Sequence, residues 1–201
     1  CNPVFVDIDP DYLTIDESKI EAAITEKTNA IIATHVYGNP CNIEAIDKIA
    51  KKYNLKVIYD AAHCFGVKYK NKSIFDYGDI STCSFHATKI FHTGEGGAIF
   101  CNKIDYSDKI FNYHNFGHDG PEDYHGIGIN GKLSEFNAAI GLAILPYIQK
   151  IIKNRRKVHS LYEKNITLNE LSKIKIRENC NWNFSYYPLI FDSENKLIKT
   201  K

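Results

Sequence analysis

The chain has 201 residues, a formal net charge of +1 and a hydrophobic fraction of 44%. These values are typical of a globular protein with one ordinary domain, or of a large piece of a bigger protein. The nearly neutral charge argues against nucleic acid or an anionic membrane surface as a partner. No apolar run approaches the roughly 20 residues that span a bilayer, so we expect no membrane segment.

The cysteine pattern argues against a metal centre and against a disulfide framework. The six cysteines are Cys1, Cys41, Cys64, Cys83, Cys101 and Cys180. They form no C-x-x-C pair and no compact cluster, so we expect no metal site and reduced thiols in a cytoplasmic protein. Methionine is absent, also at position 1, and we therefore expect a fragment or a processed product.

Strand and helix patterns alternate from the beginning of the chain. Val4–Val6 is expected to form a strand, and a helix is expected to begin near Asp16, whose side chain is a good N-cap. Residues 30–34 form the next expected strand, followed by a loop at residues 37–40. The spacing of the apolar residues in the range 43–50 then predicts a helix with one buried face.

Three further strands are expected at residues 55–59, 81–85 and 97–100. Strands that alternate with helices predict an α/β fold with a largely parallel sheet covered by helices. In such sheets, ligands bind outside the carboxyl ends of the strands. The residues that directly follow each strand are therefore the first candidates for a functional site.

The pattern changes after position 104. Residues 104–116 are expected to be helical and are followed by a loop rich in glycine and histidine at residues 117–131. A long helix is expected from Ser134, with a bend or a restart at Pro146. Residues 182–191 resemble one more strand.

Residues 84–89 carry the most informative group of side chains. A strand would place Ser84 and His86 on one face and Phe85 in the core, with Lys89 just past the strand end. The glycines at 94, 96 and 97 would allow a ligand to approach the backbone closely. A surface lysine beside a hairpin turn is the alternative interpretation.

Asp60 is the second candidate, because it directly follows the expected strand at residues 55–59. Ala61 and Ala62 leave room beside it for a flat group. The alternatives are a helix N-cap or a solvated loop carboxylate. His63 comes next, and a single histidine at such a position is often a structural residue.

Together these side chains are the kinds of group needed to hold pyridoxal 5'-phosphate (PLP). A lysine such as Lys89 forms an imine with the cofactor aldehyde. A carboxylate such as Asp60 keeps the pyridine nitrogen protonated, so that the ring can accept electrons during transamination. A hydroxyl such as that of Ser84 contributes to binding the phosphate.

Six ordered blocks of this sequence resemble the DegT/DnrJ/EryC1/StrS family of PLP-dependent nucleotide-sugar aminotransferases. The blocks are His35–Gly38, Tyr59–His63, Gly78–Asp79, Ser84–Lys89, Gly94–Ala98 and Gly128–Lys132. The resemblance implies the PLP-dependent transferase fold of type I. It implies that residues 1–145 form the core of the PLP-binding large domain, without its amino-terminal part. Residues 146–201 would then form a linking helix and the start of the small carboxy-terminal domain.

The resemblance also implies roles for individual residues. Lys89 would be the Schiff-base lysine and the base for the 1,3-proton shift, Asp60 would pair with the pyridine nitrogen, and Ser84 would bind the cofactor phosphate. His63 would lie near the cofactor ring and its phenolic oxygen. Asn130 would reach across a homodimer interface to the phosphate of the partner's cofactor. The implied substrate contacts are His86 and Tyr37.

The implied reaction moves an amino group from glutamate to a nucleotide-linked keto-sugar, for surface-polysaccharide (O-antigen) synthesis. A dTDP-4-keto-6-deoxyhexose is the substrate that the resemblance implies. Lys132 replaces an arginine that is common in the family, which puts the substrate contacts of that block in doubt. The family's amino-terminal phosphate loop and stacking aromatic residue are not present in this sequence, so we expect the chain alone to bind PLP poorly and to be inactive.

Several alternatives remain open from the sequence. Within the family they are an inactive or truncated product, a 3-keto-sugar aminotransferase and a PLP-dependent sugar dehydratase, although dehydratases have histidine in place of Lys89. An NAD-dependent enzyme would need a G-x-G-x-x-G turn between a strand and a helix, and Gly94–Gly97 lacks that spacing. A thiol hydrolase built on Cys64 or Cys83 has no supporting motif.

Overall fold

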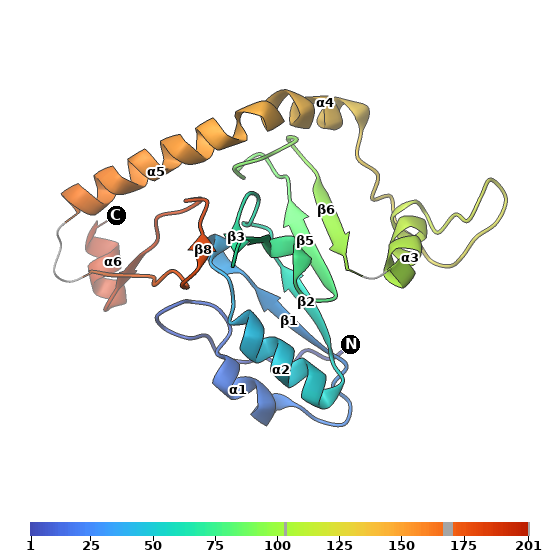
Figure 1. Cartoon of the computed structure of the whole chain (residues 1–201), viewed down its shortest axis with the longest axis horizontal. Coiled ribbons are helices and arrows are strands. Elements are labelled where there is room, and N and C mark those ends of the chain that lie inside the picture. Colours follow the sequence, from blue (N-terminus) through green and yellow to red (C-terminus); the bar gives the residue numbers. More distant parts are fainter. Residues whose placement is uncertain (103, 167–170, 201) are drawn as a thin grey trace.

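The fold is organised around a four-stranded sheet with the order β1-β2-β5-β6. The computed structural model describes residues 1–102, 104–166 and 171–200. The strands are β1 (Ala30–Thr34), β2 (Lys56–Asp60), β5 (Ile80–Ser84) and β6 (Gly97–Cys101). β1, β2 and β5 are parallel, and β6 is antiparallel to β5 (Figure 1). The predicted α/β fold with a largely parallel sheet is therefore confirmed.

Two helices pack on one face of this sheet, α1 (Glu17–Ala23) and α2 (Ile43–Tyr53). α1 begins as predicted, because the Asp16 carboxylate accepts a hydrogen bond from the backbone N–H of Ser18. α2 presents its predicted buried face to the sheet, and it ends at Asn54, which adopts a left-handed conformation.

Burial alternates along the strands, and this alternation leaves the second face of the sheet open. Ile31 and Ala33 of β1 and Val57 and Tyr59 of β2 are buried in the core shared with α2. Ile32 points to the opposite face and is 68% exposed. The expectation that helices cover the sheet therefore holds for one face among the described residues. Parallel sheets are normally covered on both faces, so the open face is a surface on which other protein can pack.

The remaining elements surround the sheet. The short strands β3 (Lys68–Tyr69), β4 (Lys72–Ser73) and β8 (Cys180–Asn181) form an antiparallel sheet, and β7 (Leu171–Lys173) pairs with β9 (Leu189–Phe191). The other helices are η1 (Val36–Gly38), η2 (Ile74–Asp76), α3 (Ile104–His114), α4 (Glu135–Ile144), η3 (Leu145–Tyr147), α5 (Ile148–Asn165) and α6 (Glu194–Thr200).

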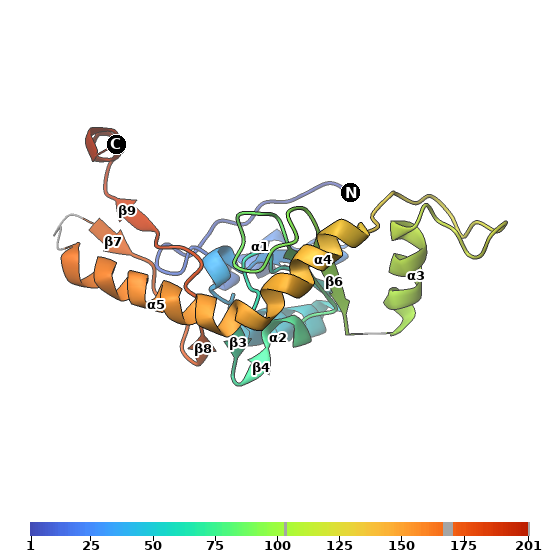
Figure 2. The ribbon, with the colours of Figure 1, turned by 90° about the horizontal axis from the view of Figure 1, so that it is seen from above.

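The helices α4, η3 and α5 form one long rod along the body (Figures 1 and 2). Its start at the Ser134 N-cap and its restart at Pro146 are as predicted. α3 and the loop that follows it project away from the sheet in both views. Within the described part of the chain, no helix combines the length and the apolarity that crossing a membrane takes.

Two strand predictions were wrong. Val4–Val6 is not a strand, because no strand among the described residues pairs with it, and Phe5 is 90% exposed. Residues 182–191 do not form one continuous strand. Phe184 has a positive φ of 56°, which interrupts the extended conformation, and only β9 at the end of the segment is a strand.

Ile46 offers a direct test of the contact between α2 and the sheet. Its side chain is fully buried, so Ile46→Ala should reduce the free energy of unfolding by about 2 to 5 kcal/mol through lost burial and a residual cavity. Urea unfolding would measure this loss. Lys51→Ala on the exposed face of the same helix is the matched control and should have little effect, because its ion pair with Asp47 is solvent-exposed. Equal losses in both variants would contradict the packing described here.

Candidate functional site

The carboxyl ends of the parallel strands bring Asp60 and Ser84 to the same region. Asp60 is the last residue of β2 and is in register with Thr34 of β1 and Thr82 of β5. Tyr59 and Cys83 point into the core, so the side chains of Asp60 and Ser84 lie on the open face of the sheet. One Asp60 oxygen accepts the N–H of Ala62 at 3.0 Å. No helix begins at Asp60, so the helix N-cap alternative is excluded.

Lys89 lies in the connection between β5 and β6 and lines a small pocket. The lining includes Ala62, His63, Thr88, Lys89, Ser185 and Tyr186. The connection is held by the backbone N–H of Lys89, which donates to the carbonyl of His86 at 2.9 Å. Phe85 packs against the rings of Phe65 and Phe91, as predicted for a core residue. Lys89 is half-buried, which argues against a simple surface lysine.

His63 forms a wall of this pocket in a defined orientation. Its Nδ1 accepts the backbone N–H of Tyr37 at 3.1 Å, so the neutral ring carries its proton on Nε2. The His63 ring is parallel to the Tyr37 ring, with 6.1 Å between centroids. Burial lowers the pKa of His63, the nearby charge of Lys89 lowers it further, and Asp60 opposes both. The lowered pKa and the occupied Nδ1 favour a neutral His63 that can donate a hydrogen bond from Nε2.

His86 and Ser84 stabilise the turn that carries Lys89. The Ser84 hydroxyl oxygen accepts the N–H of His86 at 3.3 Å, and His86 Nδ1 lies 2.8 Å from the hydroxyl oxygen of Thr88. His86 Nε2 lies 3.6 Å from a carboxylate oxygen of Glu95. His86 therefore has local structural contacts, and its predicted contact with substrate stays a prediction.

Asn130 lies apart from the other predicted site residues. It belongs to the projecting loop that follows α3 (Figures 1 and 2), and its side-chain oxygen accepts a hydrogen bond from Lys132 at 2.9 Å. It does not line the pocket that contains Lys89 of its own chain. A contact of Asn130 with this pocket within one chain is therefore not formed, and its predicted role across a dimer interface stays a prediction.

Sequence reasoning missed the contribution of residues 182–186 to the site. Tyr186 contacts both His63 and Tyr37, with ring centroids 4.8 Å and 5.3 Å apart. Ser185 also lines the pocket. The sequence predicts a strand over residues 182–191, and no short motif in this segment indicates a contact with residues more than 115 positions earlier.

The geometry argues against the two other enzyme classes. Burial raises the pKa of the Cys64 thiol well above its ordinary value and raises that of Cys83 to about 12. Catalytic thiols need the opposite shift. Gly94–Gly97 leads into β6, an antiparallel strand, and not into the helix that a dinucleotide-binding turn requires.

Comparison with protein families gives a match over almost the whole chain. The model of the DegT/DnrJ/EryC1/StrS aminotransferase family matches residues 1–200. The chain belongs to this family. It is 47% identical over 200 residues to a dTDP-4-amino-4,6-dideoxy-D-glucose transaminase of Shigella dysenteriae. The aligned region covers 98% of the chain and 54% of this relative. It is 42% identical over 168 residues to the GDP-perosamine synthase of Escherichia coli O157:H7, covering 83% of the chain and 46% of the relative.

A solved structure supports the same fold. The chain is similar to DesI, whose crystal structure was analysed in the presence of its TDP-sugar product. The TM-score is 0.87 at 34% identity, over 94% of this chain and 49% of DesI. The predicted transferase fold is thus confirmed. The chain spans about half the length of the relatives that it matches.

The electrostatic coupling between Lys89 and His63 is open to measurement. In the protein without added ligand, Lys89→Ala should raise the pKa of His63, because a nearby positive charge disfavours imidazolium. The pKa should stay below 6.5, since burial is the larger cause of its depression. Lys89→Arg keeps the cation and serves as the control. An NMR titration of His63 checks this, and an unchanged pKa in Lys89→Ala would show that the two groups are not neighbours.

Proposed function

We propose that the protein is a PLP-dependent aminotransferase that moves an amino group from glutamate to a nucleotide-linked keto-sugar. The observation that carries this proposal is the placement of Lys89, half-buried in a pocket beside His63, whose pKa is affected by the charges of both Lys89 and the strand-end Asp60. A surface lysine beside a turn would need neither of these neighbours. Membership of an aminotransferase family supports the same assignment.

The residues fit the chemical groups of PLP. Lys89 lines the pocket, and among the described residues its Nζ has no side-chain hydrogen bond or ion pair, so the neutral amine form is free to attack a carbonyl group. The Asp60 side chain accepts the N–H of Ala62, whose small side chain lines the pocket and leaves room for a flat ring. The Nε2–H of His63 can donate to the phenolic oxygen, and the Ser84 hydroxyl can bind phosphate.

Each residue has a separate task in the proposed reaction. When bound, PLP supplies an electron sink for the carbanion that transamination requires. Lys89 would hold the cofactor through its Nζ and, once the amine of a substrate has displaced it, would use the freed nitrogen to accept and return a proton. Asp60 would pair with the pyridine nitrogen. His63 orients the ring by a hydrogen bond, while Tyr186 and Tyr37 reduce the access of water to that side.

The substrate class is proposed from the relatives. A dTDP-4-keto-6-deoxyhexose is supported by the similarity to the Shigella dysenteriae dTDP-4-amino-4,6-dideoxy-D-glucose transaminase and to DesI, which was crystallised with its TDP-sugar product. Lys89 favours transamination over the dehydration carried out by family members with histidine at that position. Synthesis of a surface polysaccharide such as O-antigen is the proposed setting. A cytoplasmic location is supported by six unpaired cysteines.

Borohydride trapping tests the role of Lys89. When the full-length gene product is incubated with PLP and reduced, the peptide that contains Lys89 should gain the mass of the reduced cofactor. Lys89→Arg keeps the charge but cannot form the imine, so it should show no adduct. Lys56→Arg, a change of an exposed strand lysine, is the matched control and should retain the adduct. An adduct on another lysine, with none on Lys89, would reject the assignment.

A substrate assay with the same protein separates the family alternatives. With glutamate as donor, a 4-keto-6-deoxy sugar linked to dTDP should be converted to the amino sugar, as detected by mass spectrometry. Conversion of a 3-keto isomer alone would reassign the keto carbon. Loss of water without gain of nitrogen would indicate a dehydratase, and no conversion despite a Lys89 adduct would support an inactive family member.

A homodimer with shared active sites belongs to the same proposal. α4 carries apolar side chains that a monomer exposes to water, among them Phe136, which is 85% exposed, and Leu142. Asn130 lies far from the pocket of its own chain, as a residue that serves a partner would. We also propose residues 1–145 as the large-domain core and residues 146–201 as the linking helix and the start of the small domain.

Phe136→Glu tests the proposed dimer. A buried charge at a subunit contact is costly, so the variant should sediment with the mass of a monomer while the wild type sediments as a dimer. Lys153→Glu on the exposed side of α5 is the control and should leave the mass unchanged. A Phe136→Glu protein that remains fully dimeric would show that this face of α4 is not the interface.

A further inference from the structure

Three side chains from residues 182–185 hold the backbone of two loops in the Lys89 pocket. The Trp182 indole N–H donates to the carbonyl of Tyr37 at 2.8 Å. The Asn183 amide donates to the carbonyls of His63 and Phe65, at 2.8 Å and 3.0 Å. The Ser185 hydroxyl lies 3.3 Å from the same carbonyl of His63. These contacts join positions more than 115 residues apart.

The arrangement encloses the hydrogen bond that orients His63. That bond runs from the Tyr37 N–H to His63 Nδ1, and the carbonyls of both residues are held by the 182–185 segment. Asn183 is only 1% exposed, so few water molecules can replace its hydrogen bonds. The orientation of the imidazole therefore depends on a segment that is remote in the sequence.

The loops approach so closely that glycine is required at position 38. A Cβ atom on Gly38 would lie 2.9 Å from Asn183 Oδ1 and 3.1 Å from the His63 carbonyl oxygen. Gly38 also has a φ of +79°, which side-chain-bearing residues rarely adopt. The absence of a side chain at Gly38 therefore leaves room for the Asn183 amide beside the His63 carbonyl.

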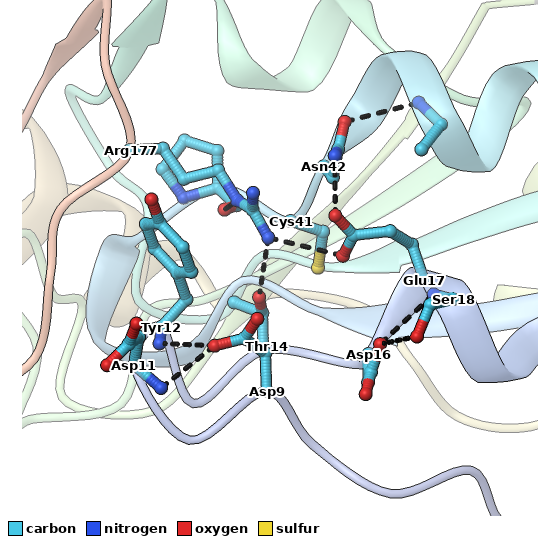
Figure 3. Close-up of polar contacts among 12 residues, drawn as sticks. Asp9, Asp11, Tyr12, Thr14, Asp16, Glu17, Ser18, Cys41, Asn42 and Arg177 are labelled. Atoms are coloured by element: carbon cyan, nitrogen blue, oxygen red, sulfur yellow. Dashed lines mark hydrogen bonds and ion pairs between the residues drawn. The ribbon is translucent and has the colours of Figure 1, made fainter.

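Arg177 anchors the beginning of this segment to the body of the protein (Figure 3). Its guanidinium lies over the Tyr12 ring, 4.1 Å from the centroid, and 3.3 Å from a carboxylate oxygen of Glu17. Its Nε–H donates to the carbonyl of Pro40 at 3.1 Å. β8 then pairs with β3 and fixes the direction in which the chain continues to Trp182.

We propose that Trp182, Asn183 and Ser185 form a clasp that positions His63 and Tyr186 beside Lys89. The three are positioning residues: they act on the site through the backbone of His63 and Tyr37. The clasp brings the Tyr186 ring to 4.8 Å from the His63 ring, and both line the pocket. This inference rests on the proposed function for its catalytic meaning, but the geometry that it predicts can be tested without any cofactor.

The test uses two variants of the full-length gene product without cofactor. Asn183→Ala removes both amide hydrogen bonds, and Trp182→Phe removes the indole N–H while keeping an aromatic ring. Both should speed hydrogen exchange of the Tyr37 amide by about tenfold or more, because Asn183→Ala releases the acceptor residue His63 and Trp182→Phe releases the donor residue Tyr37. Both should also raise the pKa of His63 toward 6.5, since a loosened wall admits water.

Two controls separate positioning from general loss of stability. Asn102→Ala removes an asparagine that also donates to two backbone carbonyls, those of Phe75 and Gly78, at the opposite end of β5. Ile46→Ala lowers stability through the core without touching the clasp. Neither control should change the pKa of His63 or the local exchange of the Tyr37 amide.

A second readout links the clasp to the cofactor. PLP should bind Asn183→Ala about tenfold more weakly than wild type, while the trapped adduct remains on Lys89. An unchanged pKa and unchanged Tyr37 exchange in both clasp variants would overturn the inference, as would equal changes in the Ile46→Ala control. If the clasp variants behave as expected but no adduct forms on Lys89 in the wild type, the proposed function fails and the clasp stands.

Discussion

The parallel pairing of β2 between β1 and β5 is the constraint on which the site depends. Because the three strands run in the same direction, their carboxyl ends meet at one edge of the sheet. This places Asp60 in register with Thr82, two residues before Ser84, and sends the chain from β5 directly to Lys89. Packing of α2 on the opposite face fixes which side chains of each strand are buried and which face the site.

Contacts from the carboxy-terminal segment complete the candidate site, of which the sheet edge forms the first part. The strands bring Asp60 and Ser84 to one region, but the wall formed by His63, Tyr37 and Tyr186 is held by hydrogen bonds from residues 182–185. Two segments that are distant in the chain thus form one candidate site together. Ordering them together costs conformational entropy, and the burial of Trp182 and Asn183 with satisfied hydrogen bonds offsets that cost.

Electrostatics gives the pocket its chemical character. His63 is neutral because burial and the Lys89 charge both oppose its protonation, and its Nδ1 is occupied by the Tyr37 N–H. It can therefore only donate from Nε2. Burial raises the pKa values of Cys64 and Cys83, which argues against a nucleophilic thiol at the site.

The sequence by itself determined the α/β class, the α1 and α2 helices and the restart at Pro146, because these depend on local periodicity and helix capping. It also identified the candidates Asp60, Ser84 and Lys89, because they belong to ordered motifs. Only the tertiary structure decided that Val4–Val6 is not a strand, that one sheet face is open, and that Tyr186 joins His63. Strand pairing and loop contacts over more than 115 residues depend on which distant groups satisfy one another, and no local pattern records that choice.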